Sequence, residues 1–156
     1  MEESLPRPYR LEKELSRLFE LGNKIDAVLL VSMLYLNQFM DSERSSIFLF
    51  QHRTQKLTIF SSLDLEKNEI QIPKFCGVTG WVFENRQPVV VNNAYEDSRF
   101  YKKVDEITGF FTRNLICTPL LDDKDNCLGT LQSLNKKTGN FTTDDLELLN
   151  LAARMV

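Results

Sequence analysis

The sequence has little of what marks a metal, redox or disulfide-rich protein. It contains one histidine, His52, and three cysteines, Cys76, Cys117 and Cys127, without CxxC spacing. His52 lies in a predicted turn with no cysteine or acidic cluster near it, so we expect neither a metal or haem site nor a cysteine–histidine catalytic pair. We interpret the odd number of cysteines as reduced core thiols rather than disulfide partners.

An excess of basic residues and a long apolar run are also missing. The net charge is −3 and the pI is near 5.3, which gives no general reason for nucleic acid to bind. The longest apolar run, residues 27–36, is about half of what a bilayer span requires, so we expect a buried helix and no membrane partner. Residues 1–10 contain two prolines and no apolar segment typical of a signal peptide, which predicts a cytoplasmic location.

The composition is typical of one soluble globular domain. Of the 156 residues, 42% are hydrophobic and 26% are charged. We expect residues 1–10 to be a disordered leader and residues 11–156 to be a single sensory domain. The last helical pattern runs to Val156 without a capping signal, so we interpret the sequence as a domain cut from a longer protein.

Hydrophobic periodicity predicts helices at both ends of the chain and strands between them. Leu11, Leu15 and Leu18 share one face of an amphipathic helix, whereas residues 26–40 are apolar nearly all round and should form a sandwiched helix. A short glycine-rich helix is predicted at 77–87 and a last helix opened by Thr142. Strands are predicted at 45–50, 56–61, 70–72, 88–91, 115–121 and 127–134.

A long insertion joins the fourth and fifth predicted strands. Residues 94–114, AYEDSRFYKKVDEITGFFTRN, exceed the roughly 12–15 residues usual for a plain connection, and they mix aromatics, carboxylates and hydroxyls. Asp105, Thr108 and Thr112 are spaced three and four apart, so in a helix they would share one face and point into a pocket. The alternative is a solvated helix face with a kink at Gly109. We predict a binding lid.

The glycine-rich helix has two interpretations. In GVTGWVFENRQ, residues 77–87, the unpaired amides of the first turn offer a site for an anion. The alternative is a tight strand-to-helix turn with Trp81 and Phe83 packed in the core. A lone GxxG motif does not decide between them.

Three longer motifs, GVTGWVFENRQPVVVNNAYED, TRNLICTPL and LGTLQSLNKKTGNFTTDDL, occur in this order and together resemble the GAF domain family over roughly residues 12–156. The resemblance implies an α+β fold, a three-layer sandwich in which a central antiparallel sheet of about six strands has helices on both faces. It also implies a homodimer through the terminal helices. The lid segment is similar to that of cyclic-nucleotide-binding GAF domains of regulatory phosphodiesterases and adenylyl cyclases.

The same subgroup carries an Asn-Lys…Phe…Asp-Glu signature. This chain matches it at Asn135, Lys136, Phe141 and Asp145, with Leu146 in place of the final Glu. The resemblance implies that the Lys and Asp pair with each other and hold the last hairpin to the last helix, which is a structural role.

The resemblance also implies a set of ligand-binding residues in four groups. They are Ser46, Ser62 and Leu63 near the base, Val78 and Thr79 at the cyclic phosphate, Asp105, Thr108 and Thr112 along the lid, and Gln132 on the floor strand. An aromatic–Asp pair of the family has become Ser62–Leu63, and the floor carboxylate has become Gln132. Losing one polar base contact costs about 1–3 kcal/mol, so we expect weaker and less selective binding.

Two other branches of the GAF family use cysteine. Bilin-binding photoreceptors attach their pigment through a lid cysteine, which this lid lacks. Free methionine sulfoxide reductases place a catalytic cysteine where this chain has Thr79, not Cys76, and their second cysteine-bearing loop is absent. We therefore expect a regulatory domain and not an enzyme, with no cofactor beyond a cyclic nucleotide or similar anionic ligand and with a separate output domain. The alternative is a ligand-free GAF module that only dimerises and transmits strain.

Overall fold

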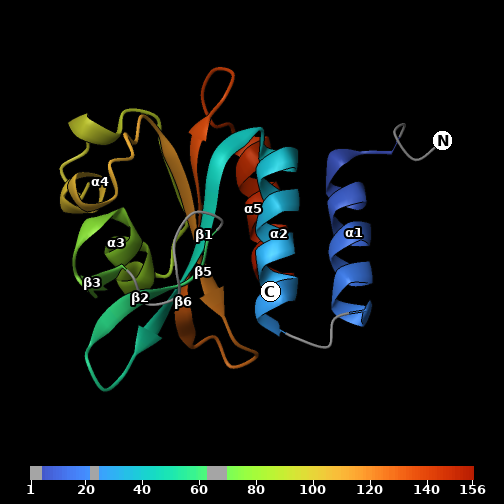
Figure 1. The fold of residues 1–156 in the computed structure, drawn as a ribbon, viewed down its shortest axis with the longest axis horizontal. Coiled ribbons are helices and arrows are strands. Elements are labelled where there is room, and N and C mark those ends of the chain that lie inside the picture. Colours follow the sequence, from blue (N-terminus) through green and yellow to red (C-terminus); the bar gives the residue numbers. More distant parts are fainter. Residues whose placement is uncertain (1–4, 22–24, 63–69) are drawn as a thin grey trace.

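The computed structural model describes residues 5–21, 25–62 and 70–156 (Figure 1). Two long helices come first, α1 (Arg7–Leu21) and α2 (Ile25–Met40). Helix α1 begins at Arg7, inside the predicted leader. Pro8 does not prevent this start, because it falls in the first turn, where a missing amide breaks no intrahelical hydrogen bond. Residues 7–10 of the predicted leader are therefore helical.

Six strands in the described ranges form one sheet of order β3-β2-β1-β6-β5-β4, with every pairing antiparallel. This confirms the predicted α+β fold. Two α-helices, α3 and α4, and a short 3₁₀ helix, η2 (Ala94–Glu96), are inserted between strands, and α5 follows the last strand. The bounds are β1 (Ser42–Gln51), β2 (Lys56–Ser62), β3 (Gln71–Pro73), α3 (Gly77–Asn85), β4 (Val89–Val91), α4 (Lys103–Thr108), β5 (Leu115–Leu121), β6 (Cys127–Lys136) and α5 (Thr143–Met155).

The helices lie in layers on both faces of the sheet. Helices α2 and α5 cover one face, and α3 and α4 lie on the other (Figure 1). Helix α1 contacts α2 and α5 on the side away from the sheet, so α2 is sandwiched, as its all-round apolarity predicts. The core between them joins Leu15 of α1, Met33 of α2, Ile47 of β1 and Leu149 of α5.

The middle of the sheet is tightly spaced at Gly129 of β6. A Cβ at this position would lie 1.9 Å from the carbonyl oxygen of Phe48 on β1. No side chain fits there, so the close approach that a glycine within a strand predicts is present. The antiparallel pairing of β1 and β6 is close at this point, and these strands supply the floor of the cavity described below.

The sequence signature at the C-terminal end joins β6 to α5. Thr142 is the N-cap of α5 and forms a capping box with Asp145, while Lys136 Nζ lies 3.0 Å from Asp145 Oδ1. This is the ion pair that the resemblance implies. Phe141 lies buried beside it, with the Lys136 ammonium 5.9 Å from the centre of the ring.

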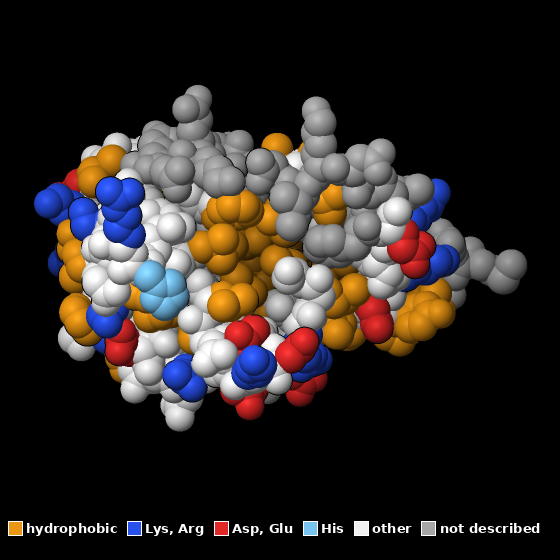
Figure 2. Space-filling model, turned by 90° about the horizontal axis from the view of Figure 1, so that it is seen from below, with side chains coloured by type: hydrophobic (Ala, Val, Ile, Leu, Met, Phe, Trp, Pro, Cys, Tyr) orange, Lys and Arg blue, Asp and Glu red, His pale blue; other side chains and the backbone are white. Residues whose placement is uncertain are grey.

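The surface is mixed in polarity. Seen from below, apolar side chains gather near the middle of the molecule, and charged side chains border them (Figure 2). No helix in the described ranges has both the length and the apolarity that crossing a bilayer would take.

Candidate functional site

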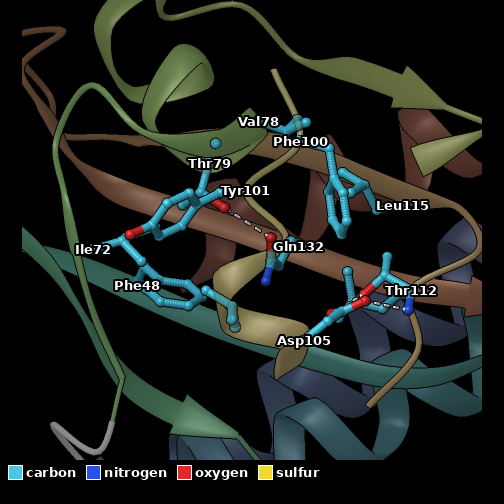
Figure 3. A pocket seen from close by; sticks show the side chains of 13 residues that line it. Phe48, Ile72, Val78, Thr79, Phe100, Tyr101, Asp105, Thr112, Leu115 and Gln132 are labelled. Carbon is cyan, nitrogen blue, oxygen red and sulfur yellow. Dashed lines mark hydrogen bonds between the residues drawn. The ribbon is translucent and has the colours of Figure 1, made fainter. Parts of the chain in front are cut away.

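A small cavity lies between the sheet and the layer formed by α3 and the lid (Figure 3). Its volume is about 60 Å³. A cavity of this size has room for a few water molecules, whereas small-molecule sites usually measure about 300–1,000 Å³. Five of the nine implied ligand residues line it: Val78, Thr79, Asp105, Thr112 and Gln132.

The floor of the cavity is a chain of hydrogen bonds centred on Gln132. Thr79 Oγ1, on α3, donates to Gln132 Oε1 at 3.0 Å, and Gln132 Nε2 donates to Ser46 Oγ at 3.1 Å. Ser46 pairs with Gln132 across β1 and β6 and does not line the cavity. It therefore positions the glutamine, which presents a neutral amide where the family has a carboxylate.

Hydrogen bonds to the Asp105 carboxylate hold the lid, residues 94–114, in its closed arrangement. Its Oδ2 accepts from the Thr112 amide at 2.7 Å and from the Tyr95 hydroxyl at 3.0 Å, and its Oδ1 accepts from the Thr112 hydroxyl at 2.7 Å. Desolvation and the hydrogen bond to Asp105 both raise the pKa of Tyr95, which keeps the phenol protonated as a donor. Asp105 thus ties three parts of the lid together.

Thr108 does not reach the cavity. Its hydroxyl donates to the Val104 carbonyl at 2.9 Å and accepts from the Phe110 amide at 3.3 Å, while Gly109 ends α4 in the left-handed conformation. The prediction that Asp105, Thr108 and Thr112 share one helix face is therefore wrong, because α4 stops at Thr108. Asp105 and Thr112 meet through the turn that follows.

The start of α3 lies beneath the lid. Gly77 opens the helix with φ +75°, and a Cβ on it would come within 3.1 Å of the Tyr101 Cβ. Phe83 packs in the core with Phe48, and Trp81 is half-buried with the Arg99 guanidinium 4.7 Å from its ring centre. Val78 and Thr79 are both buried and line the cavity, so this turn serves packing and borders the site at once.

Aromatic residues narrow the cavity. Phe48 of β1 and Phe100 and Tyr101 of the lid point into it (Figure 3). The resemblance did not name these three residues. Phe48 could have been inferred from the sequence, because it follows Ser46 by two residues and the alternation of a strand places both side chains on one face of β1. Phe111 is not among them, since it is 63% exposed and stacks on Tyr95 with 4.9 Å between ring centres.

The residues that the resemblance places near the base of a nucleotide are described only in part. Ser62 is the backbone partner of Ser46 at the end of β2, and its side chain lies outside the described atoms. Leu63 lies outside the described residues.

Thiol chemistry does not reach the cavity. In the ranges described, no cysteine lines it, and Cys117 is buried in β5, where desolvation raises its pKa to about 12. Burial also raises the pKa of Cys127, and Cys76 caps α3 without lining the cavity. The described ranges hold no group of three or more His, Cys, Asp and Glu residues suited to a metal ion.

The family model of the GAF domain matches residues 25–156. The chain belongs to the GAF domain family. It is 30% identical over 125 residues to the dual 3',5'-cyclic-AMP and -GMP phosphodiesterase 11A of Takifugu rubripes, and 30% identical over 141 residues to the probable 3',5'-cyclic phosphodiesterase pde-5 of Caenorhabditis elegans. These alignments cover 72% and 83% of this chain but only 14% and 19% of the relatives, so the GAF domain spans less than a fifth of either.

Solved structures share the fold of this GAF domain. The GAF domain of an Acinetobacter phosphoenolpyruvate-protein phosphotransferase has a TM-score of 0.81 at 17% identity, covering 97% of this chain and 91% of that one. A free methionine-R-sulfoxide reductase from Neisseria meningitidis has a TM-score of 0.71 at 17% identity, covering 95% and 84%. At such identities the likeness shows the fold alone. GAF domains are typically regulatory small-molecule sensors, although some proteins with the fold are enzymes.

Proposed function

We propose that this GAF domain is a regulatory sensor that binds a cyclic nucleotide or a similar small anion beneath its lid and signals to an output domain. One observation carries the proposal. Polar side chains from three separate parts of the chain, Thr79 of α3, Gln132 of β6 and the lid pair Asp105–Thr112, converge on one buried cavity. Burying polar side chains costs free energy, and a core that only stabilises the fold is expected to place apolar side chains around such a cavity.

The lid and the aromatic side chains leave too little space for a nucleotide in this arrangement. At about 60 Å³ the cavity excludes a nucleotide, so binding requires the lid to swing out and Phe100 and Tyr101 to move with it. A ligand that binds only the open state shifts the population toward it, and the shift of the lid is the signal.

The residues present suit such a ligand in a definite orientation. In the open state the phosphate faces the amides of Val78 and Thr79 at the start of α3, where the helix dipole favours an anion. The base then lies toward Gln132. Its amide both donates and accepts hydrogen bonds, so it discriminates between bases less than a carboxylate does.

Calorimetry with cyclic AMP and cyclic GMP tests the proposal. We expect heat of binding with at least one of them, and an affinity raised about tenfold by Asp105→Ala, because the substitution removes the hydrogen bonds that keep the lid closed. Glu106→Ala is the matched control, since Glu106 is the neighbouring, exposed carboxylate on α4. No heat with either nucleotide at millimolar concentration would rule out this ligand class.

Catalysis is no part of the proposal. The reductase fold relatives act on a sulfoxide, whereas the position that the resemblance aligns with their catalytic cysteine is Thr79, whose hydroxyl is already held by Gln132. A threonine without an adjacent base is a poor nucleophile.

A dimerisation module is the second candidate, and the solvent-exposed face of α2 favours it. Leu30 and Leu34 lie one helical turn apart and are 41% and 53% exposed, which is unusual for leucines in the middle of a helix. A second copy of the chain would cover them. In that case the aromatic-lined cavity stays closed and the lid residues have no effect on function.

Sedimentation of the domain separates this candidate from the sensor. A dimer that Leu34→Glu converts to a monomer is expected if α2 forms the interface, because a buried carboxylate opposes association. Gln87→Glu is the control, since Gln87 is an exposed residue that follows α3 and lies away from α2. A monomer at high concentration in the unaltered domain counts against the dimerisation module.

A further inference from the structure

One lid side chain, Tyr101, separates the cavity from two grooves on the surface. The first, which we name the outer groove, lies between β3 and α4 and has a volume of about 440 Å³. The second, the α3 groove, lies between α3 and the lid and has a volume of about 530 Å³. Tyr101 lines the cavity and both grooves.

Among the described residues, three side chains form the wall between the cavity and the outer groove, because Ile72, Tyr101 and Val104 line both spaces. Ile72 is held in β3 and is 3% exposed, and Val104 is held in α4. Tyr101 precedes α4 in an irregular segment, and its ring points toward Ile72 and away from the Asp105–Thr112 pair (Figure 3). Of the three, Tyr101 is the one that lies outside a helix or strand.

Little holds the Tyr101 side chain except packing. It is only half-buried, and within the described ranges its hydroxyl makes no hydrogen bond. A change of rotamer therefore breaks no hydrogen bond of the Tyr101 hydroxyl. Turning Tyr101 outward joins the cavity to the outer groove, and the combined space falls within the usual range of small-molecule sites.

The charges of the two grooves differ. The outer groove is lined by Lys56 and Lys103, which are both exposed and form no ion pair with another described residue. Among the described residues that line this groove there is no carboxylate. The α3 groove is lined by Glu84 and by Arg99, whose guanidinium is 2.7 Å from Asp97. An anion is therefore attracted to the outer groove and not to the α3 groove.

We infer that Tyr101 is a gate, and that the outer groove is the entry site for the anionic group of the ligand. The ligand class is a compact ring that carries a phosphate or carboxylate. During entry the ring passes Tyr101 into the cavity while Lys56 and Lys103 attract the anion at the entrance; the bound orientation is the one proposed above. This inference rests on the proposed function in taking the cavity as a ligand site, but the gate itself can be tested without a nucleotide.

Thiol labelling inside the cavity provides the test. Thr79→Cys places a reactive group behind Tyr101, and two methanethiosulfonates of similar size, one with a sulfonate and one with a trimethylammonium group, probe access to it. Labelling rates are measured by peptide mass spectrometry, which separates the introduced thiol from Cys76, Cys117 and Cys127. Each rate is divided by the rate of the same reagent with a free thiol.

We expect the sulfonate to label about tenfold faster than the ammonium reagent, and Lys56→Glu with Lys103→Glu to abolish this preference. Tyr101→Ala should speed labelling by both reagents, while Tyr101→Phe should leave both rates unchanged because the hydroxyl has no partner to lose. Glu84→Lys is the control in the α3 groove and should not alter the preference. Circular dichroism verifies that each variant is folded.

Two results would overturn the inference: equal rates with and without the Tyr101 ring, or a preference that follows Glu84→Lys and not the two lysines. Because no nucleotide is used, labelling reports on the gate even if calorimetry shows that neither cyclic nucleotide binds. Binding in calorimetry together with unchanged labelling in Tyr101→Ala would preserve the proposed function and remove the gate.

Discussion

Asp145 shows how a single buried charge can connect distant parts of the chain. It is 1% exposed, and its carboxylate oxygens lie 3.0 Å from Lys136 Nζ, 2.9 Å from the Thr142 amide and 3.5 Å from Arg7 Nη2. Burial acts to raise the pKa of Asp145, but the hydrogen bonds from Thr142 and Lys136 outweigh it and hold the pKa below the ordinary value. The ionised form is therefore the stabilising one.

We predict that Lys136→Met lowers the free energy of unfolding by about 3 kcal/mol, because it leaves the buried Asp145 carboxylate without its nearest cation. Urea denaturation measures the loss. Lys137→Met is the matched control, since Lys137 is the neighbouring and exposed lysine, and it should cost well under 1 kcal/mol. Equal losses in the two variants would show that the ion pair contributes nothing.

The same pair sets a pH dependence. A lowered pKa in the folded state means that the contribution of Asp145 is present above the unfolded pKa, near 4, and is lost as the pH falls through the lower folded value. The stability difference between the wild type and Lys136→Met should therefore shrink below about pH 4, as measured by urea denaturation at successive pH values.

At the scale of elements, the sequence predicts what depends on local pattern. All six strands, α2 and α5 lie within a few residues of their predicted positions, because alternation, all-round apolarity and the Thr142 cap are each visible in a short window. The start of α1 was missed because two prolines suggested disorder, although proline is tolerated in the first turn of a helix. The end of α4 was missed because it depends on the left-handed conformation at Gly109.

The candidate site was predictable where the GAF motifs fix a residue's place on an element. Thr79, Asp105, Thr112 and Gln132 line one cavity, and that they bind a ligand there stays a prediction. What could not be predicted is how tightly the cavity is filled. That depends on aromatic side chains from β1 and the lid meeting in three dimensions, and no local pattern records their packing.

At the scale of the whole molecule, hydrogen bonds link the lid to α1. Asn135, at the end of β6, donates to the Phe111 carbonyl at 2.8 Å and accepts from the Arg113 amide at 2.7 Å. The next residue, Lys136, holds Asp145, and Asp145 is bonded in turn to Arg7 in the first turn of α1. The end of the lid and the first helix are thus joined through a single segment of β6 and the start of α5.

We predict that Asn135→Gly loosens both ends of this link. Glycine keeps the left-handed backbone, φ 56°, that Asn135 adopts, so only the side-chain hydrogen bonds are removed, at a cost of about 1–3 kcal/mol. Amide hydrogen exchange should quicken in residues 110–114 and, to a smaller extent, in the first turn of α1, because the Lys136–Asp145–Arg7 contacts shift with β6. Asn140→Gly, at an exposed position in the following turn, is the control and should affect neither. If exchange quickens only in residues 110–114, the lid and α1 are not coupled through Asn135, because proximity alone does not transmit a shift.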